Sequence, residues 1–192
     1  MKNIAIIGAG GFAREVECWA TAVAPCTFYA EDEYAGGYIK PLSKFDPTKE
    51  RAVIAIGDPN QRRRIAEAMP KNTIFTTLIH PSVQFLDMCE VFINEGSIIC
   101  ANTVITSGVK LGKHTHLNLN TTIGHDCELG DYFTTAPGVN VSGNIRTGNN
   151  VYIGTNAAIR QGTSITGNVT IGMGAVVLND IKEGGTYVGL VK

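Results

Sequence analysis

The chain has 192 residues, of which 44% are hydrophobic and 17% are charged, and its formal net charge is −1. This composition allows a buried core, and the near-neutral charge argues against a nucleic-acid-binding protein. The five cysteines form no C-x-x-C pair or zinc-like cluster, which predicts reduced thiols in the cytoplasm. The apolar start MKNIAII gives way to glycines, so we expect neither a signal peptide nor a membrane span.

The N-terminal stretch KNIAIIGAGGFAREV predicts a strand, a glycine turn and a helix. Gly8, Gly10 and Ala13 match the G-x-G-x-x-G/A fingerprint, which brings backbone N–H groups at a helix start up to a phosphate. A second strand ends in Glu31 and Asp32, roughly 20 residues further on, where dinucleotide-binding folds carry a ribose-binding acid. The pattern favours a site for a nucleotide or its pyrophosphate. The alternative is a glycine turn that serves packing alone.

The stretch RAVIAIGDPNQRRRIAEAM repeats this logic, with a strand over 52–56, a turn at 57–59 and a helix from Asn60. TIFTTLIHPSV predicts one more strand. About 80 residues with three or four parallel strands make only half of a dinucleotide fold, which favours a nucleotide-linked sugar over NAD. Arg62, Arg63 and Arg64 form a basic run at the start of this helix. Arg62, beside the Gly57 turn, could reach a diphosphate, and the alternative is that the three arginines form a solvated helix face.

The second half repeats with a period of six. From Ile93 to Val177, every sixth residue is aliphatic in thirteen of fifteen cases and Thr in the other two, and the fourth residue after each is nearly always small or apolar. This period fits neither a helix nor an amphipathic strand, and it predicts a parallel β-helix in which three hexapeptides close one triangular coil. Fifteen hexapeptides predict five coils, about 24 Å in height at about 4.8 Å per coil. We therefore divide the chain into an α/β Rossmann-like half-fold at residues 1–80 and an all-β domain at residues 81–192.

The two halves together resemble the bacterial sugar acetyltransferase family that includes bacillosamine and sialic acid acetyltransferases. The resemblance is carried by IAIIGAGGFAREV, AVIAIGDPNQRRRI, LIHPSV, IGHDCELGDY and VSGNIRTGNNVYIGTNAAIRQG. It implies a left-handed β-helix, because these relatives are hexapeptide-repeat acyltransferases. It also implies a homotrimer, with a nucleotide-linked sugar on the N-terminal domain and acetyl-CoA in the groove between neighbouring β-helices.

The resemblance implies that His125 is the catalytic base and Asp126 the acidic residue beside it. An amine or hydroxyl must lose a proton as it attacks the thioester, and an imidazole with a pKa of about 6.5 suits that step. A neighbouring carboxylate can hold the imidazole in the right tautomer and raise its basicity. General-base catalysis of this kind contributes roughly 10²–10⁴-fold.

The resemblance also implies two sets of binding residues. Those for the nucleotide-linked sugar are Gly10, Gly11, Phe12, Glu31, Asp32, Gly57 and Arg62. Those for acetyl-CoA are Thr134, Gly143, Thr155 and Met173. The sequence departs from the family pattern at four places: Phe12 and Thr134 stand where relatives have His, Met173 stands where some have Gly, and the tail GTYVGLVK lacks the usual Pro.

We expect N-acetylation of a UDP- or TDP-linked 4-amino-6-deoxy sugar for surface glycan biosynthesis. One alternative is O-acetylation of a sialic acid or an O-antigen sugar, and another is a non-catalytic trimeric sensor of sugar nucleotides. A zinc site of the γ-class carbonic anhydrase type is not favoured. His114, His116 and His125 invite it, but no His pair has that family's five-residue spacing. His114 and His116 are expected to be outward strand residues, and we expect no metal, nucleic acid or membrane partner.

Overall fold

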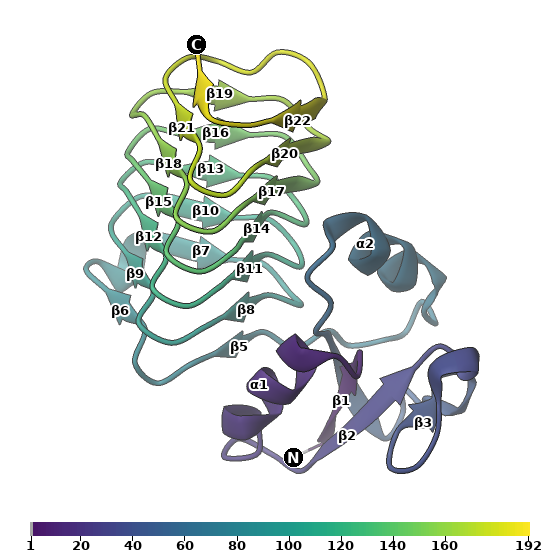
Figure 1. The fold of residues 1–192 in the computed structure, drawn as a ribbon. Coiled ribbons are helices and arrows are strands. Elements are labelled where there is room, and N and C mark those ends of the chain that lie inside the picture. Colours follow the sequence, from purple (N-terminus) through teal and green to yellow (C-terminus); the bar gives the residue numbers. More distant parts are fainter. Residues whose placement is uncertain (1) are drawn as a thin grey trace.

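The computed structural model describes residues 2–192. A small α/β domain packs beside the first coils of a tall β-helix, and the chain ends on the coil farthest from that domain (Figure 1). The predicted fold class is confirmed. Among residues 2–192, we find no helix whose length and hydropathy would let it cross a membrane.

The α/β domain holds one parallel sheet with the strand order β3-β2-β1-β4. Its strands are β1 (Asn3–Ile7), β2 (Cys26–Ala30), β3 (Lys40–Pro41) and β4 (Glu50–Ile54), and its helices are α1 (Gly11–Ala20) and α2 (Pro59–Ala68). Two short 3₁₀ helices, η1 (Asp32–Tyr34) and η2 (Leu42–Lys44), lie between β2 and β4. Ile4 and Ile6 pack in one cluster with α1, and Ala5 and Ile7 pack in another with Ile65 of α2. The alternation of side chains along β1 therefore places a helix on each face of the sheet.

The β-helix has three faces of parallel strands. Face 1 consists of β5 (Leu78–Ile79), β8 (Ile98–Ile99), β11 (His116–Leu117), β14 (Thr134–Thr135), β17 (Val151–Ile153), β20 (Val169–Ile171) and β22 (Gly185–Tyr187). Face 2 consists of β6 (Gln84–Phe85), β9 (Val104–Ile105), β12 (Thr122–Ile123), β15 (Asn140–Val141), β18 (Ala158–Ile159), β21 (Val176–Val177) and β23 (Leu190–Val191). Face 3 consists of β7 (Val91–Ile93), β10 (Val109–Leu111), β13 (Glu128–Leu129), β16 (Arg146–Thr147) and β19 (Ser164–Ile165), with η3 (Met88–Glu90) just before β7.

Residues eighteen apart pair along each face, as His116 does with Thr134 and Thr134 with Tyr152. Three hexapeptides therefore form one coil, as predicted. The predicted number of coils was too small, because strands before residue 93 and after residue 182 continue faces 1 and 2. The strand expected within TIFTTLIHPSV also needs correction. Leu78–Ile79 pairs with β8, so the β-helix begins at 78, and only Phe75 bridges to Ala52 in the N-terminal sheet.

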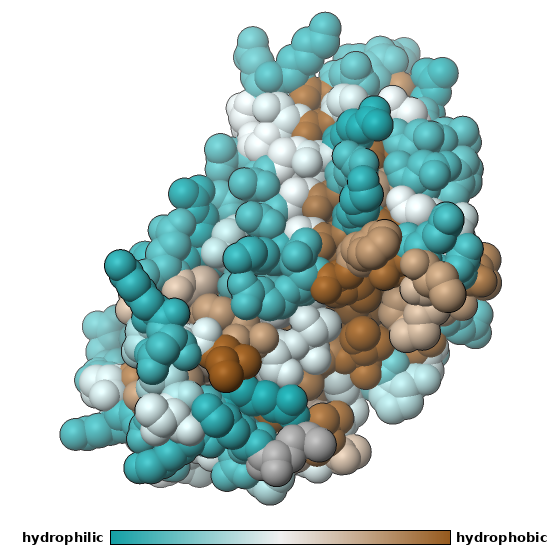
Figure 2. Space-filling model, turned by 180° about the vertical axis from the view of Figure 1, so that it is seen from behind, coloured by the Kyte–Doolittle hydropathy of each residue, from teal (hydrophilic) through white to brown (hydrophobic). Residues whose placement is uncertain are grey.

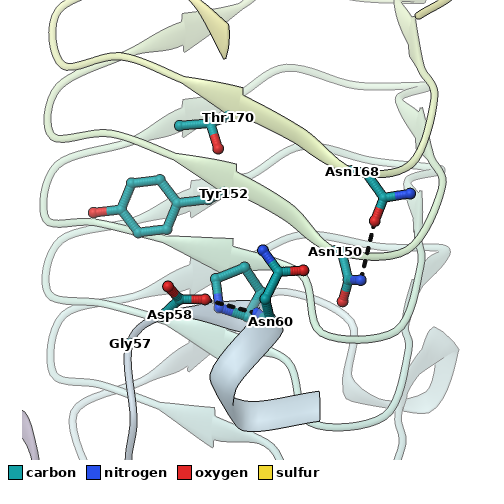
Figure 3. Close-up of a pocket in the computed structure, with 8 residues that line it drawn as sticks. Gly57, Asp58, Asn60, Asn150, Tyr152, Asn168 and Thr170 are labelled. Atoms are coloured by element: carbon teal, nitrogen blue, oxygen red, sulfur yellow. Dashed lines mark hydrogen bonds between the residues drawn. The ribbon is translucent and has the colours of Figure 1, made fainter. Parts of the chain in front are cut away.

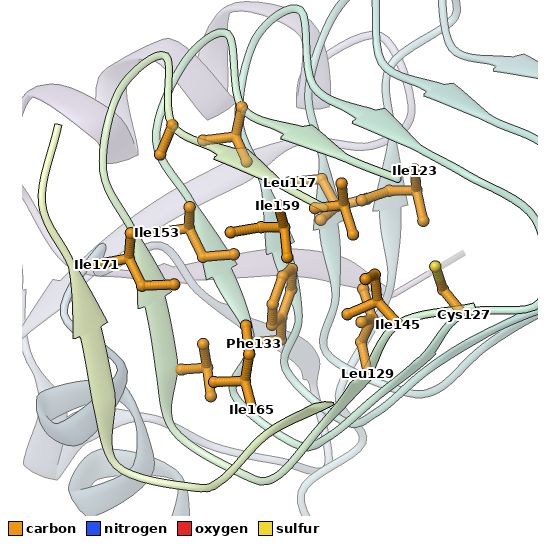
Figure 4. Packing of buried hydrophobic residues seen from close by; sticks show 14 of the residues in the cluster. Leu117, Ile123, Cys127, Leu129, Phe133, Ile145, Ile153, Ile159, Ile165 and Ile171 are labelled. Carbon is orange, nitrogen blue, oxygen red and sulfur yellow. The ribbon is translucent and has the colours of Figure 1, made fainter. Parts of the chain in front are cut away.

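The prism interior is filled by both rows of the repeat (Figure 4). The aliphatic row and the small or apolar row four residues later are almost entirely buried, which confirms the predicted core. Most hydroxyls in the second row bond to a carbonyl three residues earlier, as Thr121 does to Asn118 at 2.7 Å and Thr163 to Arg160 at 2.7 Å, whereas Thr103 donates to Asn118 O. These buried hydroxyls therefore have backbone partners at the corners.

Candidate functional site

We name the corners of the prism after the faces that they join. His125 and Asp126 lie on edge 2–3, between β12 on face 2 and β13 on face 3. The imidazole Nδ1 lies 2.7 Å from Asp126 Oδ2, and the two side chains are 50% and 63% exposed. In the neutral imidazole, a hydrogen bond to a carboxylate places the proton on Nδ1 and the lone pair on Nε2. The geometry is that of a half-exposed imidazole oriented by a neighbouring carboxylate.

The repeat explains how this pair is held. Residues eighteen apart stack on edge 2–3, and Asp126 N donates to Ser107 O while Asn144 N donates to His125 O. Asp126 has a φ of 58°, in a left-handed corner where the next coil has Asn144 with a φ of 57°. Gly143 lies beside the imidazole on the next coil, and a Cβ there would be only 2.6 Å from His125 Nε2. Glycine at 143 therefore makes room for the ring.

The predicted nucleotide-sugar residues gather around a cavity of about 460 Å³ in the α/β domain. Five of the seven predicted residues line it: Gly10, Gly11, Phe12, Glu31 and Gly57. The first glycine of the fingerprint, Gly8, has a φ of 120°, and a Cβ there would be 2.9 Å from Ala55 O. Gly8 is thus required by backbone packing. By contrast, a Cβ on Gly10 or Gly11 would meet no atom within 4 Å among residues 2–192.

The two acidic residues after β2 have different positions. Both carboxylate oxygens of Glu31 accept hydrogen bonds from Arg64 at 2.8 Å, and these bonds lower the pKa of Glu31. Asp32 lies outside the cavity, where its carboxylate accepts from Ser43 N at 3.0 Å. Asp32 therefore does not line this cavity, because the chain turns into η1 directly after Glu31, and its role in sugar binding stays a prediction.

Arg62 is not directed toward the cavity, which corrects the prediction that it reaches a diphosphate. Its side chain is fully buried between the two domains. Its Nε donates to His114 O at 3.0 Å, its Nη1 donates to Ile56 O and Gly57 O, and its Nη2 donates to Tyr132 O and to the Thr134 hydroxyl. Burial lowers the pKa of Arg62 to about 9, and the nearby Asp58 carboxylate opposes that shift.

His114 and His116 are also buried, at 3% and 2% exposure. His116 points out of the prism as expected, but it packs against Phe12 of the α/β domain, while the His114 ring stacks on Tyr132. Burial lowers the pKa of His114 to about 4 and that of His116 well below its ordinary value, and the Arg62 charge adds to both shifts. His114 Nδ1 and both nitrogens of His116 lack hydrogen-bond partners among residues 2–192. No group of metal-ligating side chains converges within residues 2–192. We name Arg62, His114 and His116 the buried cluster.

The predicted acetyl-CoA residues lie in three places. Gly143 lies beside His125 on edge 2–3. Thr155 and the 81%-exposed Met173 are stacked on edge 1–2, where Gly174 N donates to Thr155 O. Thr134 lies under the α/β domain on face 1, where it accepts the hydrogen bond from Arg62. Within one chain these residues are not brought together.

Two further clefts contain residues that the sequence did not single out. One, of about 440 Å³, lies higher on edge 2–3 and is lined in part by Arg160 and Lys182. Two steps of eighteen residues lead from His125 to Gln161 in this cleft, so the repeat spacing could have found it. The other, of about 480 Å³, lies between the start of α2 and face 1, where Tyr152 and Thr170 face Asp58 and Asn60 (Figure 3).

Comparisons with known proteins bear on both domains. A family model described as the PglD N-terminal domain matches residues 3–69. A GDP-perosamine N-acetyltransferase of Escherichia coli O157:H7 is 33% identical over 181 residues, which cover 84% of this chain and 80% of that protein.

Two solved structures superpose on nearly the whole chain. The acetyltransferase domain of PglB from Neisseria gonorrhoeae FA1090, in complex with acetyl coenzyme A, has a TM-score of 0.88 and 30% identity, covering 98% of this chain and 96% of that chain. WeeI from Acinetobacter baumannii AYE has a TM-score of 0.90 and 31% identity, covering 98% and 97%. Because these similarities span both domains in the same order, the chain belongs to the bacterial sugar N-acetyltransferases, enzymes that take their acetyl group from acetyl-CoA.

Proposed function

We propose that this enzyme transfers the acetyl group of acetyl-CoA to the 4-amino group of a nucleotide-linked 4-amino-6-deoxy sugar, with His125 as the general base, in the biosynthesis of a surface glycan. The observation that carries the proposal is the 2.7 Å contact between Nδ1 of the half-exposed His125 side chain and Asp126 Oδ2, which would orient a neutral imidazole with its lone pair on Nε2. A base must be within hydrogen-bond reach of the proton that it removes, and an exposed edge gives a substrate that access.

In the proposed reaction, the sugar nitrogen attacks the thioester carbonyl carbon and a C–N bond forms. His125 Nε2 takes the proton that the nitrogen loses, and Asp126 stabilises the resulting imidazolium. The C–S bond then breaks, and the departing CoA sulfur leaves as the thiol with the proton that His125 returns. Backbone N–H groups near the edge would stabilise the negative charge on the carbonyl oxygen.

The nucleotide part of the sugar substrate would occupy the cavity between the two glycine turns. Gly10 and Gly11 support this, because a side chain at either position would enter open space and neither glycine is required by packing. The N-terminus of α1 offers backbone N–H groups and a favourable dipole to a diphosphate. We propose a UDP- or TDP-linked sugar, and the name of the Escherichia coli relative adds GDP-perosamine to the substrates worth testing.

A homotrimer would complete the site. The residues that face outward along face 2 are uncharged (Gln84, Val104, Thr122, Asn140, Ala158, Val176 and Leu190), whereas face 3 carries the ion pairs Lys110–Glu128 and Arg146–Glu128. In a three-fold ring of triangular prisms with face 2 toward the axis, edge 2–3 of each copy lies beside edge 1–2 of the next. His125 and Gly143 of one copy would then meet Thr155 and Met173 of its neighbour.

Further support for association comes from the lower coils. Leu86, Met88 and Phe92 are 61–69% exposed, and Figure 2 shows hydrophobic surface over that part of the β-helix. Apolar surface of this kind is typical of protein contacts.

The cleft with Arg160 and Lys182 would hold phosphate groups of acetyl-CoA. It lies on the same edge as His125, about two coils or ~10 Å away at about 4.8 Å per coil. Guanidinium and ammonium groups are the usual partners of phosphates. Acetyl-CoA would then run along edge 2–3 with its thioester at His125.

The test is release of free CoA thiol with acetyl-CoA and a panel of UDP-, TDP- and GDP-linked 4-amino sugars, run with the wild type and with His125→Ala. We expect release with at least one amino sugar and a 10²–10⁴-fold lower kcat in the variant. Release only with hydroxyl acceptors would replace this proposal with O-acetylation. An active His125→Ala enzyme would remove His125 from the role of base.

A further inference from the structure

One short turn forms a wall of two cavities. Ile56 and Gly57, between β4 and α2, line the nucleotide cavity, opposite the first glycine turn. Gly57 also begins the lining of the second cleft, followed by Asp58, Pro59 and Asn60 (Figure 3). The position of this turn therefore sets the width of the nucleotide cavity on one side and of the interdomain cleft on the other.

Arg62 connects this turn to the β-helix. Nη1 donates to the carbonyls of Ile56 and Gly57 at 2.6 and 3.3 Å, within the α/β domain. On the β-helix side, Nε donates to His114 O at 3.0 Å and Nη2 donates to Tyr132 O at 3.1 Å. One guanidinium thus joins the cavity wall to two successive coils.

The chemistry of this connection is specific to arginine. All five acceptors are neutral oxygens, so the buried cation bonds to no carboxylate, and burying a charge in this way is costly. Apolar side chains could hold two domains together without that cost. A planar fork with five N–H groups can reach three segments at once, whereas the ammonium of lysine donates from a single point. What the guanidinium provides is a fixed distance and orientation between the segments.

We infer that Arg62 is a positioning residue for the sugar-nucleotide substrate: by fixing Ile56 and Gly57 relative to the β-helix, it keeps the nucleotide cavity at its binding width without touching the ligand. This inference rests on the proposed function, because it takes that cavity to be the nucleotide site. The inference predicts an effect on binding of the sugar nucleotide and none on binding of acetyl-CoA, because the prism edges proposed to bind acetyl-CoA do not depend on the position of this turn.

The experiment compares Arg62→Met and Arg62→Lys with the wild type. Arg63→Met is the matched control, because Arg63 is the next residue of α2 and its exposed side chain bonds to Glu67. GDP, UDP and TDP are each titrated alone by calorimetry, and KM is measured separately for the sugar nucleotide and for acetyl-CoA. The single tryptophan, Trp19, packs edge-on against His80 of the β-helix, so its fluorescence reports whether the domains remain docked.

For both Arg62 variants, we expect the dissociation constant of the bound nucleoside diphosphate and the KM of the sugar nucleotide to rise at least tenfold. The KM of acetyl-CoA should stay within twofold, and Arg63→Met should match the wild type. A wild type that binds none of the three diphosphates would overturn the proposed function and this inference with it. A wild type that binds one of them, alongside Arg62 variants that bind it equally well, would overturn the inference alone.

The two Arg62 variants also control for a loss of folding. If Arg62→Met is not folded at the assay temperature, Arg62→Lys, which keeps the charge, carries the test. An equal rise in both KM values, or a fall in kcat with neither KM changed, would give Arg62 a structural role only and contradict the inference.

Discussion

His125 on edge 2–3 and the two histidines of the buried cluster lie in the same repeat, yet their environments are opposite. His125 is half exposed and bonded to a carboxylate, whereas His116 is 2% exposed and neither ring nitrogen has a partner among residues 2–192. The repeat fixes which side chains enter the prism. The environment of an outward side chain is decided by what docks on that face, and here the α/β domain docks on face 1.

The difference in exposure suits the two groups of histidines to different roles. A base that exchanges protons with a substrate has to be accessible, and edge 2–3 provides that. The imidazoles of the buried cluster have no such access, and burial lowers their pKa values, with the Arg62 charge adding to both shifts. Arg62 of this cluster hydrogen-bonds to both domains.

The largest expected effect concerns the pH dependence of that attachment. The folded pKa of His114 is about 4, while an unfolded imidazole has a pKa of about 6.5. Between these values the unfolded chain binds more protons, so stability is lost as the pH falls. We expect His114 to reduce the free energy of unfolding by about 2–3 kcal/mol between pH 7 and pH 4.5, measured by urea denaturation.

His114→Asn is the control for this measurement. Asparagine occupies most of the other left-handed corners of this β-helix that are not glycine, so it suits the φ of 54° at position 114. The variant should lose less stability over the same pH range. An identical loss in the variant would mean that His114 is not buried in its neutral form.

The next prediction concerns edge 2–3. In Gly143→Ala, the new Cβ would lie 2.6 Å from His125 Nε2, so the imidazole has to move. A displacement of about 1 Å in a catalytic group can cost up to ~10²-fold, and we expect kcat to fall roughly 10–100-fold. The free energy of unfolding should change by less than about 0.5 kcal/mol, because the ring is at the surface and can shift. Ser107→Ala, one coil below His125, should keep full activity, and unchanged kcat in Gly143→Ala would argue against His125 as the base.

The smallest effect should come from Thr134→Val, which removes one acceptor from Arg62 and keeps the shape of the side chain. Arg62 Nη2 retains Tyr132 O as an acceptor, so we expect a loss of only about 1 kcal/mol in the free energy of unfolding. The KM of the sugar nucleotide should rise a few-fold, and the KM of acetyl-CoA should not change. A selective rise in the KM of acetyl-CoA would instead support the role that family resemblance gives to Thr134.

Much of the fold could be predicted from sequence, because the buried rows of the β-helix recur at a fixed spacing and the glycine fingerprint lies between a strand and a helix. Residues such as Ile123 and Phe133 are inside because of their position in the hexapeptide. Only Leu78–Ile79, the first strand of the β-helix, falls on the other side of the predicted boundary at residue 80, and His80 and Pro81 directly follow that strand in the sequence.

The positions of Arg62 and Asp32 could not be predicted in the same way. A basic run at a helix start has the same sequence whether it faces solvent, a diphosphate or another domain, and only the docking of α2 against face 1 decides among these. The turn after Glu31 likewise depends on η1, a short helix with no strong sequence signal.

The stacking of edge 2–3 has a consequence for the acyl donor. The separation between His125 and the cleft at Arg160 and Lys182 is set by whole coils, since each coil adds eighteen residues and about 4.8 Å. Inserting or deleting eighteen residues would lengthen or shorten that separation while every inward side chain stays inward. A change of six or twelve residues would also keep the buried rows inside, but it would move the cleft to another edge of the prism. If the acyl donor binds as proposed, the distance that it must span from His125 to this cleft can change only in steps of one complete coil. A longer or shorter donor would therefore require a β-helix with one coil more or one coil fewer between the two sites.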